Sequence, residues 1–174
     1  MPISLHAAFI PSALQMLGTC DHLIDKAEAW CVDHDCSPAE AIGARIHDDM
    51  APFSYQVKSV AVHSAGALNG VRQGVFAPDL APPPEDFARL RAAVGEARAE
   101  LETISDAEME DFIGRPMRFE FRAYRLDFAA EDFLLSFSQP NFYFHAATAY
   151  DILRMKGVEV GKRDFLGRMR LAAA

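Results

Sequence analysis

Apolar residues recur at steps of three and four along four stretches of the chain, which is the spacing of one face of an α-helix. These stretches cover residues 5–34, 52–70, 85–104 and 131–156. The most regular seam is that of the third stretch, formed by Phe87, Leu90, Val94, Ala97, Leu101 and Ile104. The pattern therefore predicts four long amphipathic helices.

Prolines and glycines indicate where these helices end or become irregular. Pro11 predicts a kink or restart near the beginning of the first helix, and Pro140 predicts an interruption of the fourth. Asn69-Gly70 is typical of a left-handed cap and predicts the end of the second helix. Residues 37–40 have the pattern of a capping box and predict a short additional helix.

Residues 117–128 change from helical spacing to strict alternation. A two-residue turn at Arg122-Ala123 gives a register in which one face holds three apolar pairs and the other holds two pairs of opposite charge. The pairs are Phe121 with Tyr124, Phe119 with Leu126, Met117 with Phe128, Glu120 with Arg125, and Arg118 with Asp127. Because both faces agree on one register, the segment predicts a β-hairpin before the last helix.

A long, proline-rich link over residues 72–84 separates the second and third helices. A helix of about 20 residues is about 30 Å long, and an extended link of about 13 residues reaches about 40 Å. The link is therefore long enough to cross the molecule and to set the third helix parallel to the second. The sequence predicts an all-α fold, a four-helix bundle with one long crossover and a small hairpin, as a single domain over residues 1–174.

Composition excludes several classes of partner. The net charge of −8 disfavours a nucleic-acid-binding protein, because phosphate neutralisation requires a basic face. No apolar segment reaches the length of about 18 residues that a membrane span requires, and three cysteines fit a reducing cytoplasm better than a disulfide framework. We expect a cytoplasmic protein without nucleic-acid or membrane partners. Five basic residues near the end are expected to be solvated: Lys156, Lys162, Arg163, Arg168 and Arg170.

The last third of the chain carries two dense motifs, residues 139–145 (QPNFYFH) and residues 161–167 (GKRDFLG). With these motifs the chain resembles a bacterial family of unknown function in the DinB/YfiT-like helical-bundle superfamily. The residues at 4–6, 26–29, 49–53 and 56–57 also resemble that family, so the likeness covers nearly the whole chain. The resemblance implies a four-helix bundle of up-down-down-up topology, often a homodimer, whose activity is unknown.

The resemblance also implies a metal site. DinB-like members bind a divalent metal through one histidine on the second helix and an H-x-x-x-H pair on a later helix, and some use a low-molecular-weight thiol as co-substrate. His63 and His145 match two of these positions, whereas the third falls on Asn141 or Ala149, which are not imidazoles. A catalytic zinc site as a rule has three protein ligands. The candidates to complete the set are Asp49, His47 and Glu131.

Two classes of function remain open from the sequence. The first is metal-assisted transfer or hydrolysis on a small molecule, with zinc or nickel on His63 and His145 and with catalytic assistance from Asp49, Asn141 or Tyr143. The second is a bundle without metal that binds a small ligand or is purely structural. A ligand pocket would be lined by Tyr55, Gln56, His63, Asn141, Tyr143, His145 and Tyr150. In a structural protein the aromatic residues would be core, and His145 and Asn141 would satisfy backbone groups freed by Pro140.

Overall fold

The computed structural model describes residues 3–172, so the two residues at each end of the expected domain lie outside it. The chain is mostly helical, and two of its long helical segments are continuous runs that contain a π-helical section (η). In chain order the helices are α1 (Leu5–Asp33), α2 (Pro38–Ile42), α3 (Phe53–Ala61), η1 (Val62–Gly66), α4 (Ala67–Gln73), α5 (Phe87–Leu101), α6 (Asp106–Phe112), α7 (Ala130–Asp132), η2 (Phe133–Ser138), α8 (Gln139–Met155) and α9 (Lys162–Leu166).

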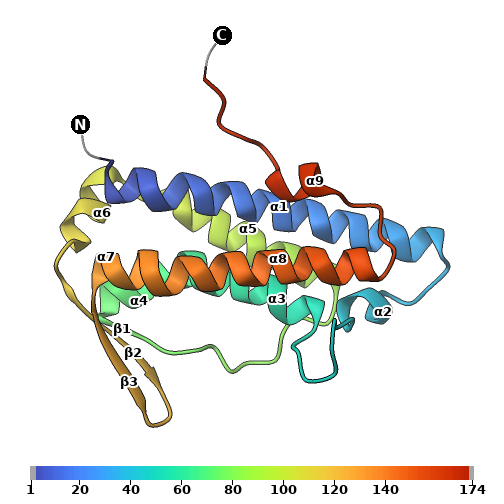
Figure 1. Cartoon of the computed structure of the whole chain (residues 1–174), viewed down its shortest axis with the longest axis horizontal. Helices are drawn as coiled ribbons and strands as arrows, with labels where there is room; N and C mark the ends of the chain where they lie inside the picture. Colours follow the sequence, from blue (N-terminus) through green and yellow to red (C-terminus); the bar gives the residue numbers. More distant parts are fainter. Residues whose placement is uncertain (1–2, 173–174) are drawn as a thin grey trace.

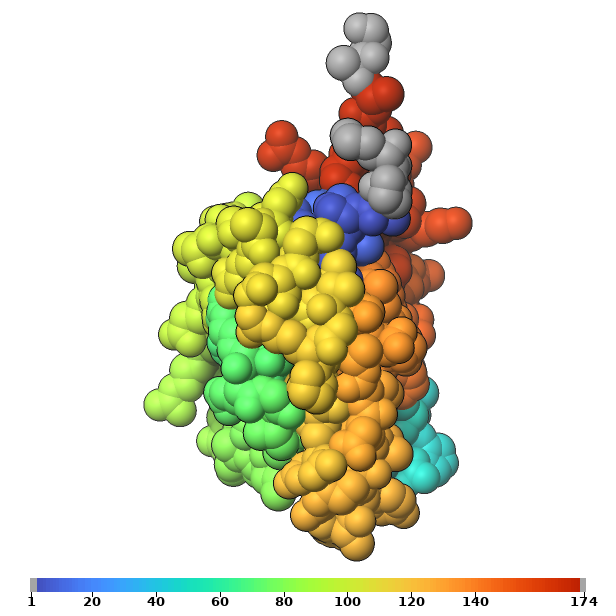
Figure 2. All heavy atoms as spheres, turned by 90° about the vertical axis from the view of Figure 1, so that its left-hand side faces the viewer, coloured from blue at the N-terminus to red at the C-terminus, as the bar shows by residue number. Residues whose placement is uncertain are grey.

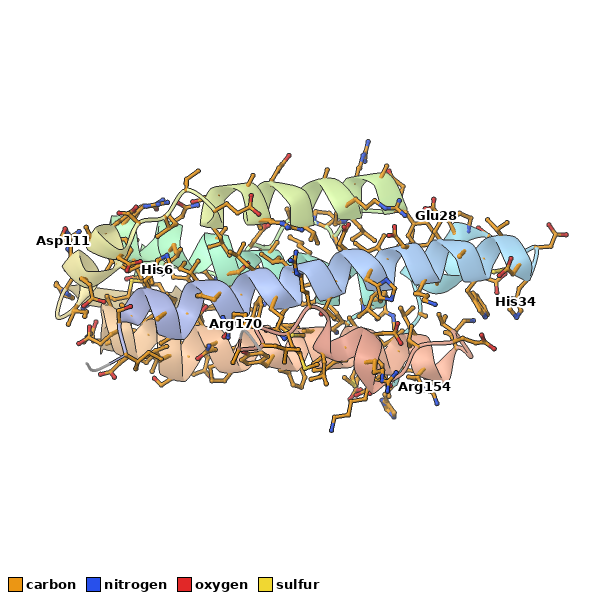
Figure 3. The ribbon with its side chains drawn as sticks, turned by 90° about the horizontal axis from the view of Figure 1, so that it is seen from above. His6, Glu28, His34, Asp111, Arg154 and Arg170 are labelled. Carbon is orange, nitrogen blue, oxygen red and sulfur yellow. The ribbon has the colours of Figure 1, made fainter. Side chains whose placement is uncertain are left out.

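The long helices pack side by side around one apolar core. Figure 3 shows α1 between α5 and α8, and α3 packs on both α5 and α8. His6, near the beginning of α1, contacts the carbonyl of Ile104 just beyond α5, whereas Arg91 near the beginning of α5 pairs with Asp25 and Glu28 toward the end of α1. These contacts show that α1 and α5 run in opposite directions. Fully buried side chains of the core include Leu17, Leu23, Phe53, Leu90 and Ile152.

A three-stranded sheet lies at one end of the molecule (Figure 1), and Figure 2 looks onto that end. Its strands are β1 (Val75–Phe76), β2 (Pro116–Phe121) and β3 (Tyr124–Ala129). The β2–β3 hairpin has the predicted register, from Phe121 opposite Tyr124 to Met117 opposite Phe128, and confirms the argument from cross-strand pairs. The parallel pairing of β1 with β2 was not predicted from the sequence.

The predicted end of the second helix at Gly70 is wrong. The helix continues to Gln73, and Gly74 provides the left-handed cap with a φ of 73°. Gly70 is instead a point of close approach, because a Cβ there would lie 2.9 Å from Cβ of Phe76 and 3.3 Å from Cε of Met117. The missing side chain allows β1 and β2 to pack directly on α4.

The other helix boundaries differ from the predictions in smaller ways. Pro11 lies inside an uninterrupted α1, so the predicted restart there is wrong. The third helix begins after its cap Asp86 and ends at Leu101, earlier than the predicted end at residue 104. The predicted interruption of the fourth helix takes the form of η2, which ends just before the helical turn that contains Pro140. Ser37 caps α2 as its sequence pattern indicates.

After β1 the link runs across one side of the helices toward the beginning of α3, as Figure 1 shows in light green. Lys58 of α3 holds it there, since its Nζ lies 2.9 Å from Oδ2 of Asp79 and donates to the carbonyl of Ala81 at 2.5 Å. Lys58 is only 8% exposed, so this ammonium is a buried anchor for the link. Within residues 3–172, no helix combines the length and the apolar character that crossing a bilayer demands.

Candidate functional site

A cavity of about 180 Å³ lies where α3, η1, the link, β2 and the beginning of α8 meet. Phe76, Phe119 and Phe137 form its apolar wall. His63 and His145 provide polar atoms on the helical side, and Lys58 with Asp79 closes the side toward the link. The cavity is thus a small aromatic chamber with two imidazoles.

The orientation of His145 is set by a chain of hydrogen bonds. The Nε2 amide group of Gln56 donates to the carbonyl of Ala51 at 2.9 Å, which turns its Oε1 toward α8. His145 Nδ1 lies 2.7 Å from that oxygen and therefore donates its proton to it. In a neutral imidazole the other nitrogen is then the acceptor, so Nε2 of His145 carries the free lone pair.

His63 is held in the same tautomer from the opposite helix. The Ser138 hydroxyl donates to the main-chain carbonyl of His63 at 3.0 Å, so its oxygen is left to accept from Nδ1 of His63 at 3.3 Å. His63 lies in η1 and Ser138 ends η2, so this contact joins the two π-helical sections. Such sections are frequent at functional sites because they redirect side chains that a regular helix would place elsewhere.

The two imidazoles form a neutral pair. Their ring centroids are 5.7 Å apart and their planes are inclined by 16°. Burial lowers the pKa of His63 to about 4, with a further contribution from the charge of His145, and burial lowers the pKa of His145 to about 4. Among the hydrogen bonds of residues 3–172, none engages either Nε2. Near neutral pH the cavity therefore presents two uncharged acceptor nitrogens.

Three other polar residues of the cavity, Asn141, Asp79 and Lys58, already have partners. Asn141 donates from Nδ2 to the carbonyl of Phe137 at 2.7 Å, one turn back along the helix. The Asp79 carboxylate is paired with Lys58, whose hydrogen bond contributes to a lowered pKa of Asp79. Tyr55 lies edge-on to His145, with ring centroids 6.0 Å apart. The two histidines are thus the groups best placed to bind a ligand.

A family model matches almost the whole chain and identifies the family to which it belongs. Residues 5–166 match the family model of a domain of unknown function, DUF1993. The chain belongs to this family. The match spans nearly the whole described chain, so the cavity lies within the family domain.

One solved structure has a fold similar to that of this DUF1993 protein. It is a DinB family member protein from Shewanella denitrificans, 25% identical, with a TM-score of 0.81 over 98% of this chain and 96% of that chain. No curated protein matches the chain. The resemblance noted in the sequence, to a family of unknown function with a DinB-like fold, is confirmed by these two likenesses.

The structure brings several of the predicted pocket residues together. Tyr55, His63, Asn141 and His145 all line the cavity, and Gln56 lies directly behind His145. Asn141 donates to the carbonyl of Phe137, three positions before Pro140, which is not the carbonyl that the proline frees one turn back. His145 does not satisfy a backbone group freed by Pro140 either, because its Nδ1 donates to another helix.

Other predicted residues lie elsewhere. Tyr143 is exposed on α8, and Tyr150 packs edge-on against Phe165 of α9 with centroids 5.7 Å apart. Asp49 lies in an exposed loop, where its carboxylate is 2.6 Å from Nδ1 of His47. None of these side chains lines the cavity of about 180 Å³ as the structure describes it. Tyr143 and Tyr150 were predicted to line the pocket and Asp49 to assist at it, and the structure places all three outside this cavity.

Sequence reasoning missed the groups that the link and the sheet contribute. Lys58 and Asp79 lie 21 positions apart, and Phe76 reaches the cavity through a two-residue strand with no alternation to reveal it. Only one feature of the sequence points to Ser138, which is its position two residues before Pro140, at the beginning of α8. Lys58 also carries a signal, because it is a charged residue between Val57 and Val60 of a predicted amphipathic helix.

The donor set does not fit the metal site that the fold family implies. In the part of the chain that the structure describes, no three His, Cys, Asp or Glu side chains gather in a way that could hold a metal ion. Glu131 accepts from the backbone of Gly114, and the cavity's carboxylate, Asp79, is held by Lys58. Two imidazoles fall short of the three protein ligands typical of a catalytic zinc site.

Proposed function

We propose that this protein is a DinB-like bundle that binds a small, mostly apolar molecule carrying hydrogen-bond donors in the cavity of His63 and His145. One observation supports the proposal above all: both Nδ1 atoms are anchored, so both Nε2 lone pairs are available to a ligand. The aromatic wall suits an apolar ligand body. The volume of about 180 Å³ is below the range of about 300–1,000 Å³ typical of drug-sized ligands, so we expect a ligand of few atoms.

The low basicity of His63 and His145 favours ligand binding over proton abstraction as the role of the cavity. A general base works best when its pKa lies near the working pH, whereas burial lowers the pKa of both histidines to about 4. Imidazoles of this kind accept hydrogen bonds but take up a proton poorly near neutral pH. A non-enzymatic binding role is therefore the first candidate.

Phenol is a suitable probe, because it combines an apolar ring with one donor, and toluene is its counterpart without the donor. We expect phenol to bind the parent protein more tightly than toluene by isothermal titration. The double variant His63→Asn with His145→Asn should weaken phenol binding about fivefold or more, since a hydrogen bond contributes about 1 kcal/mol. Asparagine places a donor near Nδ1 and removes the Nε2 acceptor.

Two results of the same titrations would contradict the proposal. Equal affinities for phenol and toluene would mean that the imidazoles do not select a donor. Unchanged phenol affinity in the double variant would place the binding elsewhere. Far-ultraviolet circular dichroism of the variant provides the control for folding.

Metal-assisted transfer or hydrolysis on a small molecule is the second candidate. The observation in its favour is that both Nδ1 atoms are hydrogen-bonded, as they are in metal-ligating histidines. Elemental analysis after loading with zinc or nickel tests it. About one metal per chain, lost in the double asparagine variant, would support this candidate and overturn the metal-free proposal.

The proposal also includes the topology of the helices, the oligomeric state and the cellular compartment. The helix directions support an up-down-down-up four-helix bundle, and a homodimer is expected from the resemblance. Light scattering would then give about twice the chain mass of 19.2 kDa. Cys20, Cys31 and Cys36 are free thiols, which agrees with a reducing cytoplasm.

A further inference from the structure

A second and larger hollow, of about 730 Å³, lies on the outer side of α1. It is bounded by α1, by the end of α5 and by α9 with the segment that follows it. Figure 3 looks onto this side and labels Arg170 beside the middle of α1. None of its lining residues lines the histidine cavity, so the two sites are separate.

The lining of this groove is strongly basic. Among the described residues that line it, four are arginines (Arg98, Arg163, Arg168 and Arg170) and one is a carboxylate, Asp164. That carboxylate is occupied, because it accepts from the backbone N–H of Gly161 and from the ring of His22, each at 2.7 Å. The groove thus concentrates positive charge in a chain whose net charge is −8.

Two of the arginines are free to bind an anion. Arg98 pairs with Glu102 at 2.9 Å, and Arg170 donates to the Ser12 hydroxyl at 3.2 Å. Within residues 3–172, Arg163 and Arg168 have no carboxylate within ion-pair distance. An unpaired guanidinium offers a planar set of donors that matches the oxygens of a phosphate group.

The turn between these two arginines is fixed on α1. Gln15 donates to the carbonyl of Leu166 at 2.7 Å, and the buried Thr19 donates to that of Phe165 at 3.0 Å. Gly167 has a φ of 57°, and a Cβ there would lie 2.6 Å from the Thr19 hydroxyl. The 161–167 motif therefore docks a rigid turn on α1, and Arg163 within it and Arg168 just after it both line the groove.

We propose that this groove binds a small phosphate-bearing molecule, with the phosphate on Arg163 and Arg168 and the less polar part against Pro11 and Leu14 of α1. The volume falls within the range of about 300–1,000 Å³ that small-molecule sites occupy. A small ligand is favoured over a nucleic acid because the basic residues form one local patch on an acidic protein.

Isothermal titration with adenosine monophosphate, and with adenosine as its counterpart without phosphate, tests the site. We expect the monophosphate to bind at least tenfold more tightly than adenosine. The variant Arg163→Gln with Arg168→Gln should lose at least tenfold in affinity for the monophosphate. The control Arg122→Gln with Arg125→Gln makes the same charge change on the hairpin and should bind as the parent does.

Three results would overturn the inference: no binding of the monophosphate, equal affinity for adenosine, or an equal loss in the hairpin control. A single-stranded oligonucleotide that binds more tightly than the monophosphate would also contradict it, in favour of a nucleic-acid surface. The double asparagine variant of His63 and His145 should keep full affinity, so failure of the histidine site and failure of the groove are distinguishable.

Discussion

Lowering the pH from 6.5 to about 4 is expected to reduce the free energy of unfolding by about 3 kcal/mol for each of His63 and His145. In the unfolded chain these imidazoles have the ordinary pKa of 6.5, whereas burial lowers it to about 4 in the folded protein. Between these values the unfolded state binds more protons, so protonation favours unfolding. The contribution is fully present above pH 6.5 and is lost as the pH falls to 4. Urea denaturation at several pH values measures it.

The double variant His63→Asn with His145→Asn is the control for this loss. Its free energy of unfolding should change much less between pH 6.5 and 4 than that of the parent, whatever its stability at pH 7. Asp79 and Asp164 do not interfere, because their pKa values are lowered from 3.8 and their contributions are lost only below that pH. An equally steep dependence in the variant would show that other groups are responsible.

The substitution Gly70→Ala is expected to destabilise the protein by about 1–3 kcal/mol, the usual effect of overpacking a close contact. The new Cβ would lie 2.9 Å from Cβ of Phe76, an atom next to the backbone that cannot rotate away. The helix and β1 would then have to separate, and the cavity wall that Phe76 provides would shift with them. Thermal or urea denaturation measures the effect.

Gly95→Ala is the matched control. Gly95 is also inside a long helix, but a Cβ there would meet no atom within 4 Å. Replacing an unconstrained helical glycine by alanine should stabilise the protein by about 0.5–1 kcal/mol. If the two substitutions had the same effect, the close packing of α4 on β1 and β2 would not be the reason for Gly70.

Much of the fold follows from local patterns in the sequence. The apolar seam from Phe87 to Leu101 and the two faces of the hairpin each depend on residues that are close in the chain. The spacing of apolar residues was therefore sufficient to predict the helix, and the apolar and charged cross-strand pairs were sufficient to predict the hairpin register. Gly70 shows the limit of this reasoning. Its role depends on Phe76 and Met117, and a glycine in sequence looks the same whether it caps a helix or admits a neighbour.

The candidate site could be predicted in part, because aromatic and polar side chains on bundle helices are typical of a ligand cleft. On that ground His63, Tyr55 and His145 were predicted to line a pocket, and all three line the cavity. Tyr143 was included because it is aromatic, but its side chain is exposed. The anchoring partners Gln56 and Ser138 act across 89 and 75 positions, and no spacing rule reveals such pairs.

Long-range ¹H–¹⁵N NMR correlations of the histidine rings test the central claim most directly, since they report both the tautomer and the pKa of each imidazole. We expect His63 and His145 to be neutral and protonated on Nδ1 at pH 7, and to titrate near pH 4. Protonation on Nε2 in either ring, or titration near the ordinary value of 6.5, would contradict the account of two free acceptor nitrogens facing the cavity.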